Sequence, residues 1–177
     1  MAERVPVSKA MPPIGWQFGC KRRSDYEVGT DRKISHGGCA SAYLKSRTRT
    51  PQDFATLMQA FGVKEYRGKR LQMTAHVKAE KVKKWAGLWM RVDGRRGSTL
   101  SFDNMKSRPI KGTCNWTKHA IVLDVPDEST LISFGVLLDG QGRVWVDDFE
   151  FEVVTTEVPT TGESPYSRQP RNLDFEE

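Results

Sequence analysis

Apolar and polar residues alternate one by one along much of this chain from residue 69 onward. The alternation is clearest at residues 69–80 and returns at residues 85–93, 99–103, 119–125, 132–138 and 143–154. Successive side chains of a β-strand point to opposite faces, so a period of two predicts half-buried strands. Turn-forming pairs such as Asp93-Gly94 and Pro126-Asp127 end two of these segments. The pattern therefore predicts a series of short antiparallel strands.

The part of the chain before residue 69 gives weaker signals. Residues 14–20, 26–28 and 41–46 are further strand candidates. Residues 52–61 differ, because their apolar positions follow i, i+3, i+4, i+7 spacing, which predicts one short helical segment. Eight or nine short strands with almost no helix indicate an all-β, antiparallel, two-sheet sandwich.

The last predicted strand changes its apolar parity in the middle. Val144 and Val146 occupy even positions, whereas Phe149 and Phe151 occupy odd ones. One extra residue at Asp147-Asp148 would keep all four side chains on one face, which predicts a β-bulge there. Two adjacent carboxylates at a bulge could hold a cation or a neighbouring backbone. A simple bend of the strand is the alternative.

Composition sets the class of protein and the domain limits. Residues 1–13 contain three prolines and residues 156–177 are polar and acidic, so we expect an arm, a domain at 14–155 and a tail. The 177 residues include no apolar run long enough for a transmembrane helix and no apolar leader. Three cysteines without a C-x-x-C spacing favour reduced thiols. We therefore expect a cytoplasmic protein with no membrane partner.

The net charge of +6 is unevenly distributed. Residues 147–177 hold nine acidic and two basic residues, a net of −7, against +13 for the first 146 residues. A basic body could bind a polyanion. The basic residues are scattered and no DNA-binding motif is present, so we expect them to serve solubility and do not expect nucleic acid as a partner. The sequence carries no signal for an oligomeric state.

The strand positions that alternate with the apolar ones, and so face away from the core, hold residues that are unusual for a solvent-exposed face. Trp85, Trp89, Arg91 and Asp93 alternate with the aliphatic row of one strand, and Trp145 with that of another. The neighbouring strands also direct polar residues away from the core, and these are Gln72, Thr74, His76, Ser101, Asp103 and Asn104. Indole rings stack on sugars or aromatic rings, and the polar groups can bond a ligand's rim. The alternative is a second, minor core under residues 51–62.

Several segments together resemble a known bacterial domain. They include Tyr66-Arg67-Gly68-Lys69-Arg70, Trp85-Ala86-Gly87-Leu88-Trp89-Met90-Arg91-Val92-Asp93-Gly94, Ser101-Phe102-Asp103-Asn104-Met105, and Gly142-Arg143-Val144-Trp145-Val146-Asp147-Asp148. The resemblance covers roughly residues 14–155. That domain occurs alone or at the C-terminus of helix-turn-helix transcriptional regulators; with so few residues before it, we expect no DNA-reading domain in this chain. The resemblance implies a galactose-binding-like jelly roll similar to carbohydrate-binding modules.

Carbohydrate-binding jelly rolls often hold a structural calcium ion near their first and last strands. Here the resemblance implies that Glu27 or Asp31, together with Asp147 or Asp148, would supply the oxygen ligands. No nucleotide-binding or hydrolase motif is present, and we expect no organic cofactor.

Three functions follow, in order of preference. The first is binding of a carbohydrate-like or polar aromatic small molecule. In it Trp89, Trp145 and Trp85 stack, Arg91, Asp103, Asn104 and Gln72 orient the ligand, and His76 lines the floor. The second is a cyclase or isomerase on the same scaffold, with Asp103 or Asp93 as general acid and His76 as proton shuttle. The third is a polyanion-binding accessory protein.

Overall fold

Antiparallel strands make up nearly all of the regular secondary structure in the described chain. The structure is a computed structural model, and it describes residues 11–162. The strands are β1 (Gln17–Cys20), β2 (Tyr26–Asp31), β3 (Ser41–Ser46), β4 (Phe54–Gly62), β5 (Lys69–Asp93), β6 (Thr99–Asp103), β7 (Ile110–Val125), β8 (Leu131–Asp139) and β9 (Arg143–Val154). A single 3-10 turn, η1 (Arg95–Gly97), joins β5 to β6.

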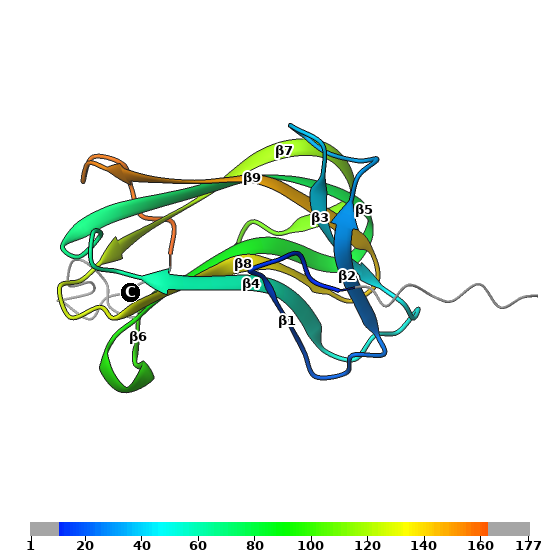
Figure 1. Ribbon diagram of the computed structural model, residues 1–177, viewed down its shortest axis with the longest axis horizontal. Helices are drawn as coiled ribbons and strands as arrows, with labels where there is room; N and C mark the ends of the chain where they lie inside the picture. The colour runs from blue at the N-terminus through cyan, green and yellow to red at the C-terminus, as the bar shows by residue number, and fades with distance from the viewer. Residues whose placement is uncertain (1–10, 163–177) are drawn as a thin grey trace, which may run out of the picture.

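Strand β5 belongs to both layers of the sandwich. Its first half pairs with β7 and β9, and its second half pairs with β8 and β6. One layer therefore has the order β7-β5-β9-β3-β2 and the other the order β6-β5-β8-β4-β1. Figure 1 shows β7 and β9 above and β4 and β8 below. This confirms the all-β, two-sheet antiparallel jelly-roll sandwich.

The core lies between the layers and is lined by one parity of each strand. In the first half of β5 the odd residues 71–79 are buried, whereas in the second half the even residues 86–92 are. The sequence pattern suggested two separate strands here. The structure instead has one strand that changes parity near Lys81, whose φ is +51°, with register shifts on both sides.

The predicted helical segment at residues 52–61 is wrong. Most of it belongs to β4, which pairs with β8 along its whole length and with β1 on its other side. Its fully buried apolar residues, Ala55 and Leu57, are two apart, as a strand requires. The spacing of Phe54, Leu57, Met58 and Phe61 also fits a strand in part, and ladder pairing on both sides decides between the two.

The predicted bulge in β9 is confirmed. His76 pairs with Asp147 and Thr74 with Glu150, so two residues of β9 stand opposite the single residue Ala75. Asp148 takes a left-handed backbone conformation with φ of +52°. Phe149 and Phe151 thereby join the same core as Val144 and Val146.

The segment that follows β9 packs against the sandwich. The guanidinium group of buried Arg70 donates to the carbonyl oxygens of Thr156 and Val158, at 2.8 and 2.6 Å. Residues 1–10 and 163–177 lie outside the described residues, so the arm, the tail and their boundaries stay predictions. Within residues 11–162 no helix is long and apolar enough to cross a membrane.

Candidate functional site

A groove on the outer face of the β8-containing layer gathers four aromatic side chains. Its volume is about 210 Å³, and it is lined by Phe54, Trp85, Trp89, Arg91, Phe102, Asn104 and Leu137. We call it the aromatic groove. Because the even residues of this half of β5 face the core, Trp85, Trp89 and Arg91 must point outward. The structure thus brings together Trp85, Trp89, Arg91 and Asn104 among the predicted site residues.

Trp89 forms the floor of the aromatic groove. Only 8% of its surface is exposed, and its indole N–H donates to Thr56 Oγ1 at 2.8 Å. Gly135 stands opposite Trp89 on β8, and a Cβ there would collide with the Leu57 carbonyl oxygen of β4, so the close approach of that strand requires glycine. The Thr56 hydroxyl in turn donates to the Val136 carbonyl at 3.0 Å. This chain of hydrogen bonds fixes the indole in one orientation.

Trp85 and Asn104 form the wall next to this floor. The indole N–H of Trp85 donates to Asp139 Oδ2 at 3.2 Å, and Lys84 pairs with the same oxygen at 2.6 Å. Gly87 lies between the two tryptophans on the outward parity. A Cβ there would come within 2.9 Å of the Asn104 carbonyl oxygen. Glycine is therefore required for the loop that carries Asn104 to pass over β5.

Two exposed phenylalanines complete the groove, and the sequence reasoning missed both. Phe54 is 45% exposed and Phe102 is 39% exposed. Phe54 lies in the segment that was expected to be helical. Phe102 was placed in the apolar, inward row of its strand, but β6 turns Phe102 outward and buries Asp103. A one-residue error in parity exchanged these two side chains.

Both candidate acids are buried and paired with arginine side chains. Asp103 is 7% exposed and accepts hydrogen bonds from Arg108, at 2.6 and 3.2 Å, and from the Thr161 hydroxyl at 2.6 Å. It reaches only an adjoining hollow of about 260 Å³. Asp93 is 6% exposed and pairs with Arg91 Nε at 2.8 Å.

Arg108 also affects a half-buried histidine. Burial, together with the positive charge of Arg108, lowers the pKa of His119 on β7, and no partner in the described residues bonds its buried Nε2. A lowered pKa in the folded state means that the unfolded chain binds more protons at mildly acidic pH. The folded state therefore gains stability above the ordinary histidine pKa and loses it as the pH falls.

We expect the free energy of unfolding to decrease between pH 7 and pH 5 and to decrease less in the His119→Gln variant. Urea unfolding at several pH values measures both. Parallel pH profiles for the two proteins would contradict this role for His119.

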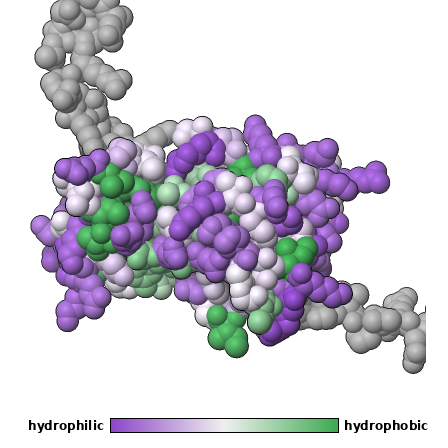
Figure 2. Space-filling model, turned by 90° about the horizontal axis from the view of Figure 1, so that it is seen from above, coloured by the Kyte–Doolittle hydropathy of each residue, from purple (hydrophilic) through white to green (hydrophobic). Residues whose placement is uncertain are grey.

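Three predicted site residues lie elsewhere. Trp145 has outward parity as predicted, but it sits in the β9-containing layer, on the opposite face of the sandwich. It is only 2% exposed, because its N–H donates to Asp31 Oδ2 at 3.0 Å and the Arg143 guanidinium covers its ring at 4.3 Å. Gln72 and His76 are in the first half of β5 and also belong to that layer. Figure 2 shows that this upper face is mostly hydrophilic, with small separate apolar patches.

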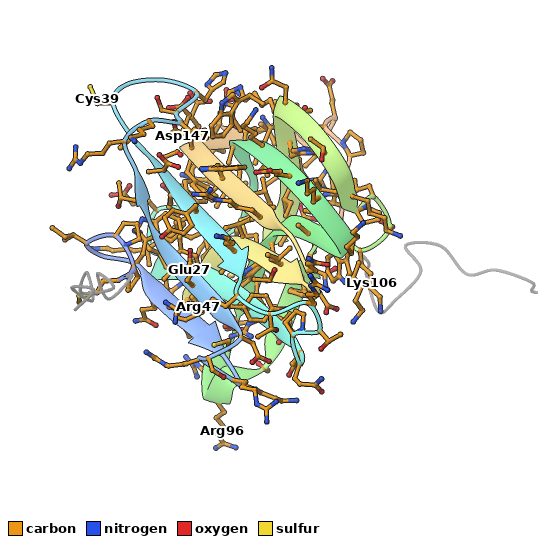
Figure 3. All side chains as sticks on the ribbon, turned by 90° about the vertical axis from the view of Figure 1, so that its right-hand side faces the viewer. Glu27, Cys39, Arg47, Arg96, Lys106 and Asp147 are labelled. Atoms are coloured by element: carbon orange, nitrogen blue, oxygen red, sulfur yellow. The ribbon has the colours of Figure 1, made fainter. Side chains whose placement is uncertain are left out.

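The carboxylates proposed for calcium do not form one site. Glu27 pairs with Arg47 at 3.2 Å, well away from Asp147 in Figure 3. Asp31 is held by Trp145 and by Arg143 at 3.3 Å, and these contacts, the Trp145 hydrogen bond foremost, lower its pKa. Calcium needs six to eight oxygens around one point. These carboxylates are instead occupied separately, and this placement does not fit the ion.

Comparison with known proteins identifies one close relative. The chain is 47% identical over 167 residues to the uncharacterized HTH-type transcriptional regulator YbfP of Bacillus subtilis strain 168. The match covers 92% of this chain but only 57% of the regulator, so the chain spans little more than half of its relative's length. No family model matches the chain.

The solved structures that are similar in fold are distant in sequence. The CBM22-1 xylan-binding domain of Paenibacillus barcinonensis Xyn10C has a TM-score of 0.56 at 14% identity, over 84% of this chain and 92% of the domain. A Stig cyclase of Fischerella sp. TAU, solved with an indole compound, has a TM-score of 0.52 at 14% identity, over 82% of this chain and 87% of the cyclase. The chain has the jelly-roll fold of carbohydrate-binding modules.

Proposed function

We propose that this chain is a binding module that holds a ring-shaped small molecule, a carbohydrate or a polar aromatic compound, in the aromatic groove. The observation that carries the proposal is the convergence of four aromatic side chains with Arg91 and Asn104 on one outer face. Apolar ring faces with a few polar groups at the rim are typical of ligand sites. Exposed Phe54 and Phe102 have no partner role in the core that would otherwise explain them.

The similar proteins support this reading without fixing the ligand. Several are carbohydrate-binding modules, and one is a cyclase that was solved with an indole compound. Both kinds of ligand present a flat face and a polar edge. The relationship to the Bacillus subtilis regulator suggests a sensing role, in which ligand binding by a domain like this one controls an attached DNA-binding domain.

Ligand binding can be tested by thermal shift and calorimetry with xylo-oligosaccharides and with indole as probes. A ligand at about 100 times its dissociation constant stabilises the folded state by about 2.7 kcal/mol. We expect Phe102→Ala and Trp85→Ala to weaken binding at least about 10-fold. Ring stacking alone contributes about 0.5–1.5 kcal/mol beyond burial, and about 1.4 kcal/mol corresponds to tenfold.

Trp116→Ala is the matched control, because Trp116 is also half-buried but lies on β7, outside the groove. It should bind as the unmodified chain does. Equal affinity of the groove variants and the control would overturn the proposal, as would the absence of any shift with both probe classes.

An enzymatic role on the same scaffold is a second candidate, favoured by the likeness to the Stig cyclase. The ion pairs of Asp103 and Asp93 argue for binding rather than acid catalysis. Turnover of a bound probe that is lost in Asp103→Asn would favour the enzyme.

A further inference from the structure

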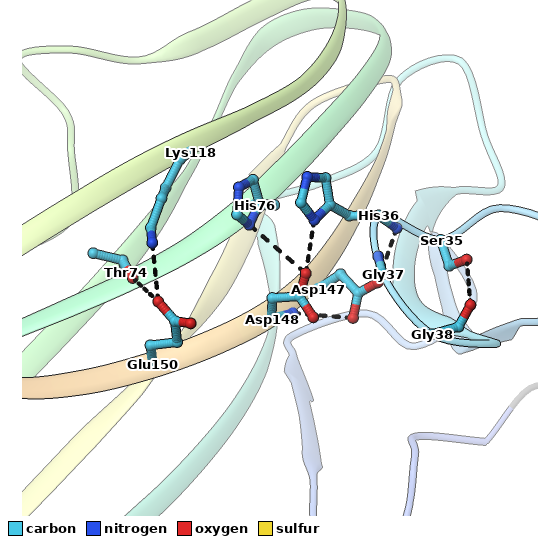
Figure 4. Close-up of polar contacts among 10 residues, drawn as sticks. All are labelled: Ser35, His36, Gly37, Gly38, Thr74, His76, Lys118, Asp147, Asp148 and Glu150. Carbon is cyan, nitrogen blue, oxygen red and sulfur yellow. Dashed lines mark hydrogen bonds and ion pairs between the residues drawn. The ribbon is translucent and has the colours of Figure 1, made fainter.

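Three potential metal ligands meet at the bulge of β9. His36, His76 and Asp148 offer one ligand atom each, and these atoms all lie within 4.8 Å of one another. His36 Nδ1 is 2.7 Å and His76 Nδ1 3.8 Å from the same oxygen, Oδ2 of Asp148. Figure 4 shows both imidazoles facing this carboxylate. Among residues 11–162 this is the one group of three such side chains.

The bulge and a neighbouring loop hold this group in place. Asp147 Oδ2 accepts the backbone N–H groups of His36 and Gly37, at 2.9 and 3.3 Å, which ties the loop between β2 and β3 to the bulge. The left-handed conformation of Asp148 gives it a direction different from that of a regular strand residue. A Cβ at Gly37 would lie 3.2 Å from the Asp148 carboxylate, so the loop packs closely on it.

One potential ligand atom of this cluster has no hydrogen-bond partner in the described chain. The Nδ1 atom of His76 is buried and has no hydrogen-bond partner in the described chain. The two imidazole rings are stacked, with centroids 3.6 Å apart and planes 10° from parallel. A buried ring nitrogen without a partner destabilises the folded state. A bound cation would remove this cost.

We propose that His36, His76 and Asp148 bind a divalent transition metal ion of the zinc class. Two imidazole nitrogens and one carboxylate are ligands that suit Zn²⁺, Co²⁺ or Ni²⁺, whereas Ca²⁺ and Mg²⁺ require oxygen atoms. Bonds of about 2.0–2.1 Å in a tetrahedral site place ligand atoms about 3.3 Å apart. The two distances to Asp148 Oδ2 lie on either side of that value.

Metal binding requires a small rearrangement of the rings. Parallel imidazoles direct their nitrogen lone pairs along parallel lines, so the rings must tilt apart to meet one ion. The side chain of His36 is 36% exposed and on a loop, which allows this motion. Three protein ligands leave a fourth position for water or an external ligand, and Asp148 also borders an apolar pocket of about 320 Å³.

The test uses untagged, metal-free protein titrated with Zn²⁺ by calorimetry and with Co²⁺ by visible absorption. We expect one ion to bind per chain, and bound Co²⁺ to show the d–d absorption bands of a distorted tetrahedral site. His36→Ala, His76→Ala and Asp148→Asn should each weaken Zn²⁺ binding more than about 100-fold, since even the loss of an outer-shell partner costs about 10–100-fold. Asparagine is chosen because it tolerates the left-handed conformation of residue 148.

Two controls make the result specific to this site. His119→Gln removes the remaining histidine of the chain, and Cys39→Ser removes an exposed thiol near His36. Both should bind Zn²⁺ as the unmodified chain does. The proposal fails if Zn²⁺ does not bind, if the three site variants bind normally while Cys39→Ser does not, or if Ca²⁺ displaces Zn²⁺ at equal concentration. Failure of the aromatic groove to bind a ligand would leave this result unaffected.

Discussion

Replacing Trp89 with alanine should lower the free energy of unfolding by about 3–5 kcal/mol, the usual cost of removing a buried tryptophan. Trp89 is 8% exposed and donates its N–H to Thr56, so the substitution opens a cavity and breaks a buried hydrogen bond. Urea unfolding followed by circular dichroism measures the change.

The comparison with Phe102→Ala separates the floor of the groove from its rim. Phe102 is 39% exposed, so its removal should cost less than about 1 kcal/mol of stability while still weakening ligand binding. If Trp89→Ala unfolds at the same urea concentration as the unmodified chain, Trp89 is not part of the structural floor. Trp89→Phe keeps most of the apolar volume, so its free energy of unfolding should lie between those of Trp89→Ala and the unmodified chain.

The parity of apolar residues carried most of the correct predictions. In β9 the change from even to odd positions required one extra residue at Asp147-Asp148, and the structure has it there. In the second half of β5 the even row faces the core, so Trp85, Trp89 and Arg91 were correctly placed on one outer face. Parity is reliable in these strands because one face is buried against a large apolar surface.

The alternation of apolar residues gave wrong predictions where the direction of a side chain does not determine its exposure to solvent, or where the alternation is short or ambiguous. Trp145 has outward parity, yet Arg143 of its own strand and Asp31 of β2 cover it, because long polar side chains can fold over an outward-facing ring. In the short strand β6 only a few residues carry the pattern, and Phe102 and Asp103 were exchanged. At residues 52–61 the same apolar spacing partly fits helix and strand, so pairing with β8 had to decide.

The cluster of His36, His76 and Asp148 lay beyond any local pattern. Asp148 is 112 residues from His36, and the two meet only because Asp147 binds the backbone of the loop that carries His36. The sequence reasoning did suggest that carboxylates at the bulge could hold a backbone or a cation. It had no means of selecting which of the three histidines would be near.

Deletion of Asp148 should prevent the chain from folding. Removing the extra residue would turn Phe149 and Phe151 to the outer face of the sheet, or else displace Val144 and Val146 from the core. The ring of Phe134 contacts both phenylalanines, at centroid distances of 5.3 and 4.8 Å. Removing a fully buried phenylalanine costs about 3–5 kcal/mol, which is an upper bound for each of these two partly buried rings, and a domain has only about 5–15 kcal/mol in total.

The matched control for this deletion is Asp148→Gly, which keeps the residue count. Glycine adopts a φ of +52° without the strain of a side chain, and this gain offsets the lost contact with His36. The variant should therefore unfold within about 1 kcal/mol of the unmodified chain. Circular dichroism and urea unfolding distinguish the outcomes. A deletion variant as stable as Asp148→Gly would mean that the core tolerates either register of β9, and that the bulge is not what fixes it.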